Sequence, residues 1–239
     1  NEHFNGIQGL CFVLWVKRDE LSAHEASIQK QGFPNYHVHP KGQRDFYAPV
    51  IYLEPFEERN LNAFGYDGYS EIVRRTALEK ARDQNTVALT GKITLVQESH
   101  KNIQAGTAMC APVYKKNMPI NTVEQRRAAL YGWVTSPFRM KDLFDNILSS
   151  TLDIDVAQIH LSVYDGHLTS VEHLLYEVNV PTQTNQIYRH FQLPLNYDFN
   201  GTTWTLVFEQ SKALSQINYR KAWFTFSAGV IVTLLVFLL

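Results

Sequence analysis

The sequence predicts an α+β fold in which two modules built on antiparallel sheets are followed by a membrane-spanning helix. The order of elements carries the first part of this prediction. Two strand-like runs and two helical segments, followed by three further strand-like runs in succession, favour helices on one face of an antiparallel sheet over alternating βα units. A second group of strand-like runs with little helix follows residue 151 and indicates a smaller second sheet. The chain then ends in an apolar stretch at residues 222–239.

The first module is expected to begin with a buried strand, since residues 6–16 (GIQGLCFVLWV) are rich in β-branched and aromatic residues. A helix should follow, because Asp19 can cap its start and Gly32 can end it. Residues 45–56 (DFYAPVIYLEPF) predict another strand. Pro49 favours an irregular strand or one at the edge of the sheet, because proline lacks the backbone donor that an inner strand uses.

A second helix is predicted from Ser70, as its N-cap, to about Gln84. Its small apolar residues fall on one stripe, formed by Val73, Ala77 and Ala81. Three strand-like runs come next, VALTGKITLVQE, AGTAMCAPVYKK and LYGWVTSPFR. Residues 1–139 are therefore assigned to a first, membrane-distal module, in which a pocket can form between the sheet and its helices.

A connecting helix is predicted at residues 140–151 (MKDLFDNILSST). Residues 152–221 hold four strand-like runs and a linker, which we assign to a smaller, membrane-proximal module. Asp165-Gly166 and Asn200-Gly201 are typical of tight hairpin turns, whose central residues need a positive φ.

The final segment, residues 222–239 (AWFTFSAGVIVTLLVFLL), carries no charge. About 17 to 20 such residues are enough to cross a bilayer, and a core helix of a globular protein would show a polar face. Trp223 and Phe224 stand at its start, where interfacial aromatic residues are typical. The sequence thus predicts a transmembrane helix as the contact of this chain with the lipid bilayer.

Composition argues against several classes of function. The 22 basic and 23 acidic residues give a formal charge of −1 without long runs of one sign, which disfavours nucleic acid as a partner. No phosphate loop, dinucleotide fingerprint or nucleophile elbow is present, so the sequence indicates no cofactor and no catalytic residue. His37 and His39 alternate as metal ligands sometimes do, but no third ligand is indicated, and we assign no metal site. Cys11 and Cys110 are expected to be buried and unpaired, with a single bridge as the alternative.

The candidate site lies in the motif AFGYDGYS around Asp67. Gly65 and Gly68 let the backbone bend, while Tyr66 and Tyr69 supply aromatic walls around one carboxylate. Such a carboxylate can accept hydrogen bonds from the N–H groups of a ligand in an otherwise apolar pocket. The alternative is that Asp67 is an ordinary turn residue, which is common between glycines.

The longest motifs resemble those of one known family. They are GFPNY, then RDFYAPVIYLEPFEERNLNAFGYDGYSEIVRRTALEKARDQNTVALTGKITLVQE, then AGTAMCAPVY and YGWVTSPFRMKDL. Over about residues 6–148 the chain resembles the CHASE domain, the extracellular sensor of hybrid histidine kinases, diguanylate cyclases and plant cytokinin receptors. The resemblance implies tandem PAS-like modules outside the cytoplasm, periplasmic or extracellular, framed by membrane helices and working as a homodimer.

For the site, the resemblance implies that Asp67 matches the aspartate that pairs with adenine in the cytokinin-binding members. Leu89 resembles an apolar wall of that pocket, with Thr90 beside it. Cys110 matches a strand position that faces the pocket and holds threonine in the plant receptors. Tyr66 and Tyr69 would reshape the cavity, so the ligand itself does not carry over.

Three hypotheses follow. The first is a sensor that binds a small molecule, cytokinin-like or other, and signals through the membrane helix; the fragment is then not an enzyme, while the full-length protein is a histidine kinase or nucleotide cyclase. The second is a membrane-anchored hydrolase outside the cytoplasm that uses His37, His39 or Asp67 with Glu71. The third is a module that binds a partner protein and no small ligand.

Overall fold

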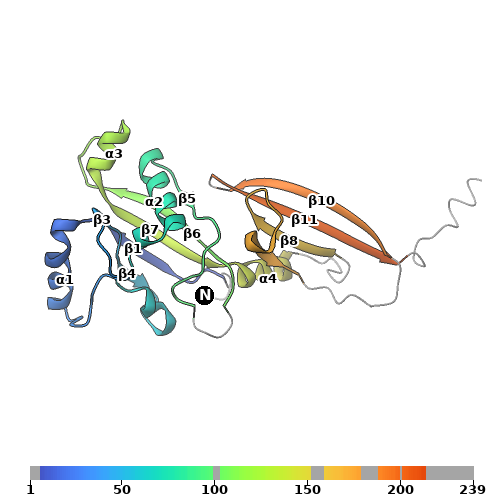
Figure 1. Cartoon of the computed structure of the whole chain (residues 1–239), viewed down its shortest axis with the longest axis horizontal. Coiled ribbons are helices and arrows are strands. Elements are labelled where there is room, and N and C mark those ends of the chain that lie inside the picture. The colour runs from blue at the N-terminus through green and yellow to red at the C-terminus, as the bar shows by residue number, and fades with distance from the viewer. Residues whose placement is uncertain (1–5, 99–102, 152–158, 179–187, 200, 214–239) are drawn as a thin grey trace, which may run out of the picture.

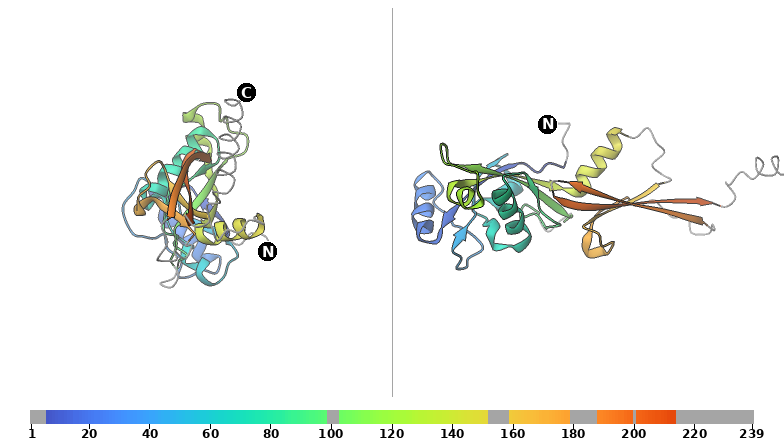
Figure 2. Two further views of the ribbon diagram at one scale, coloured as in Figure 1. Left: turned by 90° about the vertical axis from the view of Figure 1, so that its right-hand side faces the viewer. Right: turned by 90° about the horizontal axis from the view of Figure 1, so that it is seen from above.

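The computed structural model describes residues 6–98, 103–151, 159–178, 188–199 and 201–213. The molecule is elongated, with a five-stranded sheet at one end and a four-stranded sheet at the other (Figure 1). Helix α4 lies between them, and the long β10–β11 hairpin extends along the same axis (Figure 2). This mixture of helices and antiparallel sheets confirms the predicted α+β class.

The first sheet has the strand order β4-β1-β7-β6-β5, and every neighbouring pair is antiparallel. Its strands are β1 (Leu10–Leu14), β4 (Val50–Glu54), β5 (Ala88–Leu89), β6 (Gly106–Tyr114) and β7 (Leu130–Arg139). Strand β7 lies at the centre, where its run of aromatic and β-branched residues is paired on both sides. Strand β4 begins directly after Pro49 and occupies one edge, which confirms the position expected from that proline.

Helix α2 (Ile72–Gln84) covers one face of this sheet. Its stripe of small residues allows close approach, so Ala77, Leu78 and Ala81 are buried against the sheet. Trp133 of β7 is fully buried there, and its indole Nε1 donates to the carbonyl oxygen of Leu78 at 2.9 Å. The main core of the first module therefore lies between α2 and the sheet.

The start of α2 differs in one detail from the sequence expectation. The cap is Glu71, whose carboxylate accepts from the backbone amides of Val73 and Arg74 at 2.8 and 3.0 Å. The Ser70 hydroxyl instead donates to the carbonyl oxygen of Asp67, closing the short 3₁₀ turn η3 (Gly68–Ser70). Either side chain can satisfy the free amides of a first turn, and the extended backbone at residue 71 places Glu71 there.

Smaller elements complete the first module. Helix α1 (Leu21–Lys30) follows the 3₁₀ turn η1 (Arg18–Glu20) and confirms the first predicted helix. Its Leu21 and Ile28 pack on a minor core beside the short pair β2 (Val16–Lys17) and β3 (Phe46–Tyr47). A further 3₁₀ turn, η2 (Glu58–Ala63), follows β4. Helix α3 (Val123–Ala129) was not predicted.

One predicted strand is much shorter than expected. Of residues 87–98, only Ala88–Leu89 pair as a strand, and Ile93 adds one isolated bridge to Gly106. The remainder crosses the end of the sheet as an irregular segment. Ile93 and Leu95 of this segment are nevertheless buried, and burial favours apolar side chains whether or not the backbone pairs in a sheet.

The second sheet has the order β10-β11-β8-β9. Its strands are β8 (Ile159–Asp165), β9 (Leu174–Glu177), β10 (Tyr188–Phe199) and β11 (Thr202–Ala213). Helix α4 (Met140–Thr151) continues directly from β7, confirms the predicted connecting helix, and stacks Phe144 on Tyr176 with ring centroids 4.9 Å apart.

The two expected hairpin turns have different outcomes. Phe199 pairs with Thr202, and Gly201 has a φ of 76°, so a tight turn joins β10 to β11; Asn200 itself lies outside the described residues. Asp165-Gly166 is not a two-residue turn, because Tyr164 pairs with Leu174 across a longer loop that contains the 3₁₀ turn η5 (Val171–His173).

Within the described ranges, no helix combines the length and the apolar character needed to cross a bilayer. The predicted transmembrane helix, residues 222–239, lies outside the residues that the structure describes.

Candidate functional site

A cavity of about 70 Å³ lies between the first sheet and helix α2. Its apolar lining includes Val13, Val50, Leu78, Ile93, Leu95 and Val96. Its polar lining residues are Tyr66, Arg74, Thr90, Gln97 and Thr135. A largely apolar cavity with a few polar groups is typical of sites for small molecules.

Three neighbouring strands supply one wall of the cavity. Cys11 of β1 and Cys110 of β6 are both paired in register with Thr135 of β7, so these three residues form a row across the sheet. Side chains of directly paired residues point to the same face of a sheet, which here is the face toward α2. Both thiols and the Thr135 side chain therefore border the same space.

The two cysteines are free, as expected from the sequence. Because a whole strand separates them, their Cα atoms are roughly 9 to 10 Å apart, beyond the limit of about 7 Å for a disulfide. Burial raises the pKa of the Cys11 thiol to about 11, although the hydrogen bond with Thr135 acts to lower this pKa. Burial likewise raises the pKa of Cys110 to about 12, against the opposing charge of Arg74. Both are neutral thiols at physiological pH.

Arg74 is the one charged residue in the described lining of the cavity. Its Nη1 donates to the Tyr66 hydroxyl and to Glu71 Oε2, each at 3.3 Å, and its Nη2 donates to the carbonyl oxygen of Thr94 at 2.6 Å. The guanidinium also lies 5.2 Å from the centre of the Tyr66 ring. The charge of Arg74 is thus matched by Glu71, and both Arg74 and Tyr66 are held in place.

Leu89 and Thr90 belong to the same extended segment and contact different parts of the molecule. The Thr90 hydroxyl accepts from the Ala108 amide at 2.8 Å, and the residue lines the cavity. Leu89 packs in the core beneath the second sheet, together with Met140, Leu161 and Trp204. Successive side chains of an extended chain point in opposite directions, which explains the division.

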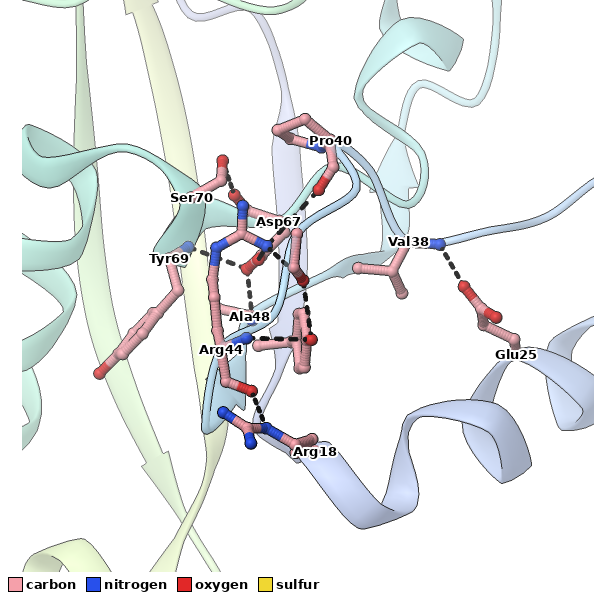
Figure 3. A network of polar contacts seen from close by, with 11 residues as sticks. Arg18, Glu25, Val38, Pro40, Arg44, Ala48, Asp67, Tyr69 and Ser70 are labelled. Atoms are coloured by element: carbon pink, nitrogen blue, oxygen red, sulfur yellow. Dashed lines mark hydrogen bonds and ion pairs between the residues drawn. The ribbon is translucent and has the colours of Figure 1, made fainter.

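Asp67 is fully buried beside the cavity and is not among its lining residues. Figure 3 shows its carboxylate surrounded by protein groups. Oδ1 accepts from the amides of Ala48 and Tyr69 at 2.7 and 2.9 Å. Arg44 Nη1 lies 3.2 Å from Oδ2, close enough for an ion pair but outside the alignment of a directed hydrogen bond. The carboxylate thereby joins the loop before β4 to the turn after Tyr66.

Burial raises the pKa of Asp67, and four neighbours oppose that effect. They are the amides of Ala48 and Tyr69, followed by the charges of Arg44 and His39. Gly68, which follows Asp67, lines the cavity, so the Asp67 contacts position part of the cavity wall.

Tyr69 faces the main core rather than the cavity. Its ring contacts Trp15 and Trp133, and its hydroxyl accepts from Arg82 Nη1 at 3.2 Å. Burial raises the pKa of Tyr69. The structure therefore brings Tyr66, Thr90 and Cys110 to the cavity, and places Asp67, Tyr69 and Leu89 around it. Three polar lining residues were missed by the sequence reasoning, Arg74, Gln97 and Thr135.

The residues named for a hydrolase are engaged in other contacts. Glu71 caps α2, and His39 Nε2 lies 3.2 Å from the carbonyl oxygen of Phe64. His37 and His39 lie near one another, with ring centroids 5.7 Å apart. In the described part of the chain, no three His, Cys, Asp or Glu side chains cluster closely enough to hold a metal ion.

The first sheet and helix α2 thus border a mostly apolar cavity with a few polar groups. The family model of the CHASE domain matches residues 1–176, and the chain belongs to the CHASE domain family. The match extends through α4 into the second sheet and ends at Tyr176 in β9.

A curated relative is the hybrid signal transduction histidine kinase A of Dictyostelium discoideum. It is 26% identical to this chain over 141 residues. The aligned region covers 57% of this chain and 6% of the relative, so the chain spans a small part of that protein's length.

Proposed function

We propose that the chain is the extracytoplasmic sensor of a transmembrane receptor, either a histidine kinase or a diguanylate cyclase. It binds a small molecule in the cavity between the first sheet and α2. The observation that carries this proposal is the cavity itself, lined by residues from four strands and a helix in a chain of the CHASE family. Both modules are proposed to be PAS-like, which the antiparallel order β4-β1-β7-β6-β5 supports.

The size of the cavity favours a small ligand. Its volume of about 70 Å³ is several times the roughly 10 to 15 Å³ that one water requires. It is well below the roughly 300 Å³ at the lower end of pockets for drug-sized ligands. An adenine-like ligand therefore requires the cavity to widen, and Asp67 would meet it only if the turn at Gly68 moved.

Signal transfer is proposed to run through the segment that starts at β5. The carbonyl oxygen of Leu89 accepts from the Thr202 hydroxyl at 3.0 Å, and the Lys92 amide donates to Asp165 Oδ2 at 2.7 Å. Residues of the same segment, Thr90 and Ile93, line the cavity. A ligand that prefers one cavity geometry thus biases the position of the second sheet by its difference in affinity between the two states. In a homodimer, that shift would reach the predicted membrane helix.

A pair of matched substitutions tests the cavity as the ligand site. Ala108→Leu adds bulk to a lining residue, whereas Ala111→Leu makes the same change on the opposite face of β6. The measurement is a thermal-shift screen of the whole chain against purines, amines and lipophilic signals. We expect a stabilising ligand to act on wild type and Ala111→Leu but not on Ala108→Leu. A ligand that stabilises all three equally would contradict the proposal.

A further inference from the structure

Gln97 is the least satisfied polar residue of the cavity. It lies in the irregular segment after β5, lines the cavity, and is only 6% exposed. Among the residues that the structure describes, none forms a hydrogen bond with its carboxamide. Its amide nitrogen and oxygen are not among the fully buried side-chain atoms that lack a partner, so the carboxamide remains accessible to a molecule in the cavity. Gln97 can therefore offer both its donor and its acceptor to a molecule in the cavity.

The other polar groups of the cavity are already engaged. Arg74 is bonded to Tyr66, Glu71 and Thr94, and the Thr90 hydroxyl accepts from a backbone amide. No carboxylate belongs to the described lining. An anion would find the Arg74 charge already matched, and a cation would find no counter-charge. The chemistry of the cavity thus favours an uncharged ligand.

A carboxamide offers one acceptor oxygen and an NH₂ donor side by side. The group that satisfies both at once carries a donor and an acceptor on neighbouring atoms, as a primary amide or a lactam does. We propose that Gln97 is the specificity residue of the cavity and selects small, uncharged ligands with such an amide-like edge. This inference rests on the proposed function, because it assumes that the cavity is the ligand site.

Two probes of nearly equal shape isolate the contribution of Gln97. 2-Pyrrolidone presents an N–H beside a carbonyl, and cyclopentanone presents the carbonyl alone. Their affinities for the whole chain are measured by ligand-observed NMR titration. We expect wild type to bind 2-pyrrolidone roughly tenfold more tightly than cyclopentanone, the gain typical of one additional net hydrogen bond.

Gln97→Leu should bind both probes with equal affinity, because it keeps the size of the side chain and removes its polar edge. Gln104→Leu is the matched control, since Gln104 bonds Asp142 instead of lining this cavity. It should retain the wild-type preference.

The outcomes separate the two proposals. Equal affinities of the two probes for wild type, or a preference that survives in Gln97→Leu, would overturn the role of Gln97. If Ala108→Leu nevertheless abolishes binding of both probes, the cavity stays the ligand site. Probe binding that Ala108→Leu leaves unaltered would contradict the proposed function as well. Failure of both probes to bind wild type would refute the amide-edge ligand class.

Discussion

At the scale of one residue, the Asp67 carboxylate of the candidate site has a structural role. Its two amide contacts tie the chain before β4 to the turn η3, and Arg44 adds an opposite charge. These contacts hold Gly68 against the cavity. Direct contact between Asp67 and a ligand, which the resemblance implies, stays a prediction.

Asp67→Ala tests the structural role. We expect it to lower the free energy of unfolding by about 2 to 4 kcal/mol, because charge-assisted hydrogen bonds contribute about 1.5 to 3 kcal/mol and their donors would remain buried. Asp67→Asn keeps the Oδ1 acceptor and should cost less. Urea unfolding measures both, and calorimetric titration with a screened ligand runs beside it. Unchanged stability with a ten- to hundredfold loss of affinity would instead place Asp67 in direct contact with the ligand.

The two thiols supply a dependence of stability on pH. Their pKa values of about 11 and about 12 in the folded protein lie above the ordinary value of 9.0, so the folded state holds its protons more tightly. Their contribution is complete below pH 9 and is lost as the pH rises toward 11 to 12. Each thiol contributes a slope of up to about 1.4 kcal/mol per pH unit.

We therefore expect the free energy of unfolding to fall less steeply between pH 9 and 11 in Cys110→Ala than in wild type. Urea titrations at several pH values measure the two slopes, and buried tyrosines contribute equally to both proteins. Identical slopes would mean that Cys110 is not held in its neutral form.

At the scale of elements, the sequence predicted a helix or strand correctly where its local residue pattern matched its role in the tertiary structure. Strand β7 and helix α4 matched their predicted bounds. The strand is paired on both sides and the helix has an apolar face, and both features produce a recognisable residue pattern. Residues 87–98 show the same composition as a strand, yet most of them line a cavity. Helix α3 was missed although Thr122 and Gln125 form a reciprocal capping box, a signal that was present in the sequence.

The candidate site was harder to predict for a physical reason. Tyr66, Thr90 and Cys110, which the sequence analysis named, line the cavity; the positions of Arg74, Gln97 and Thr135 depend on how α2 and the irregular segment pack on the sheet. The Asp165-Gly166 dipeptide likewise resembles a tight turn, while its carboxylate serves a contact with Lys92, distant in sequence. Contacts of this kind leave no local pattern.

The contact between Asp165 and Lys92 can be tested alone. Asp165→Ala should speed hydrogen exchange at the Lys92 amide by roughly tenfold or more, because a hydrogen bond to a charged acceptor is lost. Asp198→Ala is the control, since Asp198 bonds the Gly201 amide at another position. NMR exchange of the whole chain provides the measurement. Equal rates at Lys92 in both variants would show that this contact does not hold the segment.

At the scale of the whole molecule, the two sheets are arranged along one axis, and the β10–β11 hairpin extends away from the first sheet (Figure 1). The cavity is lined by residues of the first sheet, α2 and the segment after β5. Helix α4 and the segment after β5 both connect the sheets. An elongated sensor of this form suits a receptor that relays a change along its length.

The proposed topology is tested by a reporter inserted after Asn218. We expect residues 1–221 to lie outside the cytoplasm, because CHASE is an extracellular sensor domain and residues 222–239 are long and apolar enough to cross a bilayer. A reporter that is active only outside the cytoplasm should give signal. Activity of a cytoplasm-only reporter at the same position would reverse the assignment.

Strand β5 contains only two residues, and successive side chains of this segment point to different parts of the molecule. Leu89 packs under the second sheet, while Thr90, immediately after it, lines the cavity. A single-residue insertion or deletion just before β5 would exchange these directions, placing a hydroxyl in an apolar core and an extra apolar group in the cavity. Loops usually absorb length changes, but this short segment cannot. Length variation among natural homologues should therefore be scarce here and should collect instead in the loops away from β5.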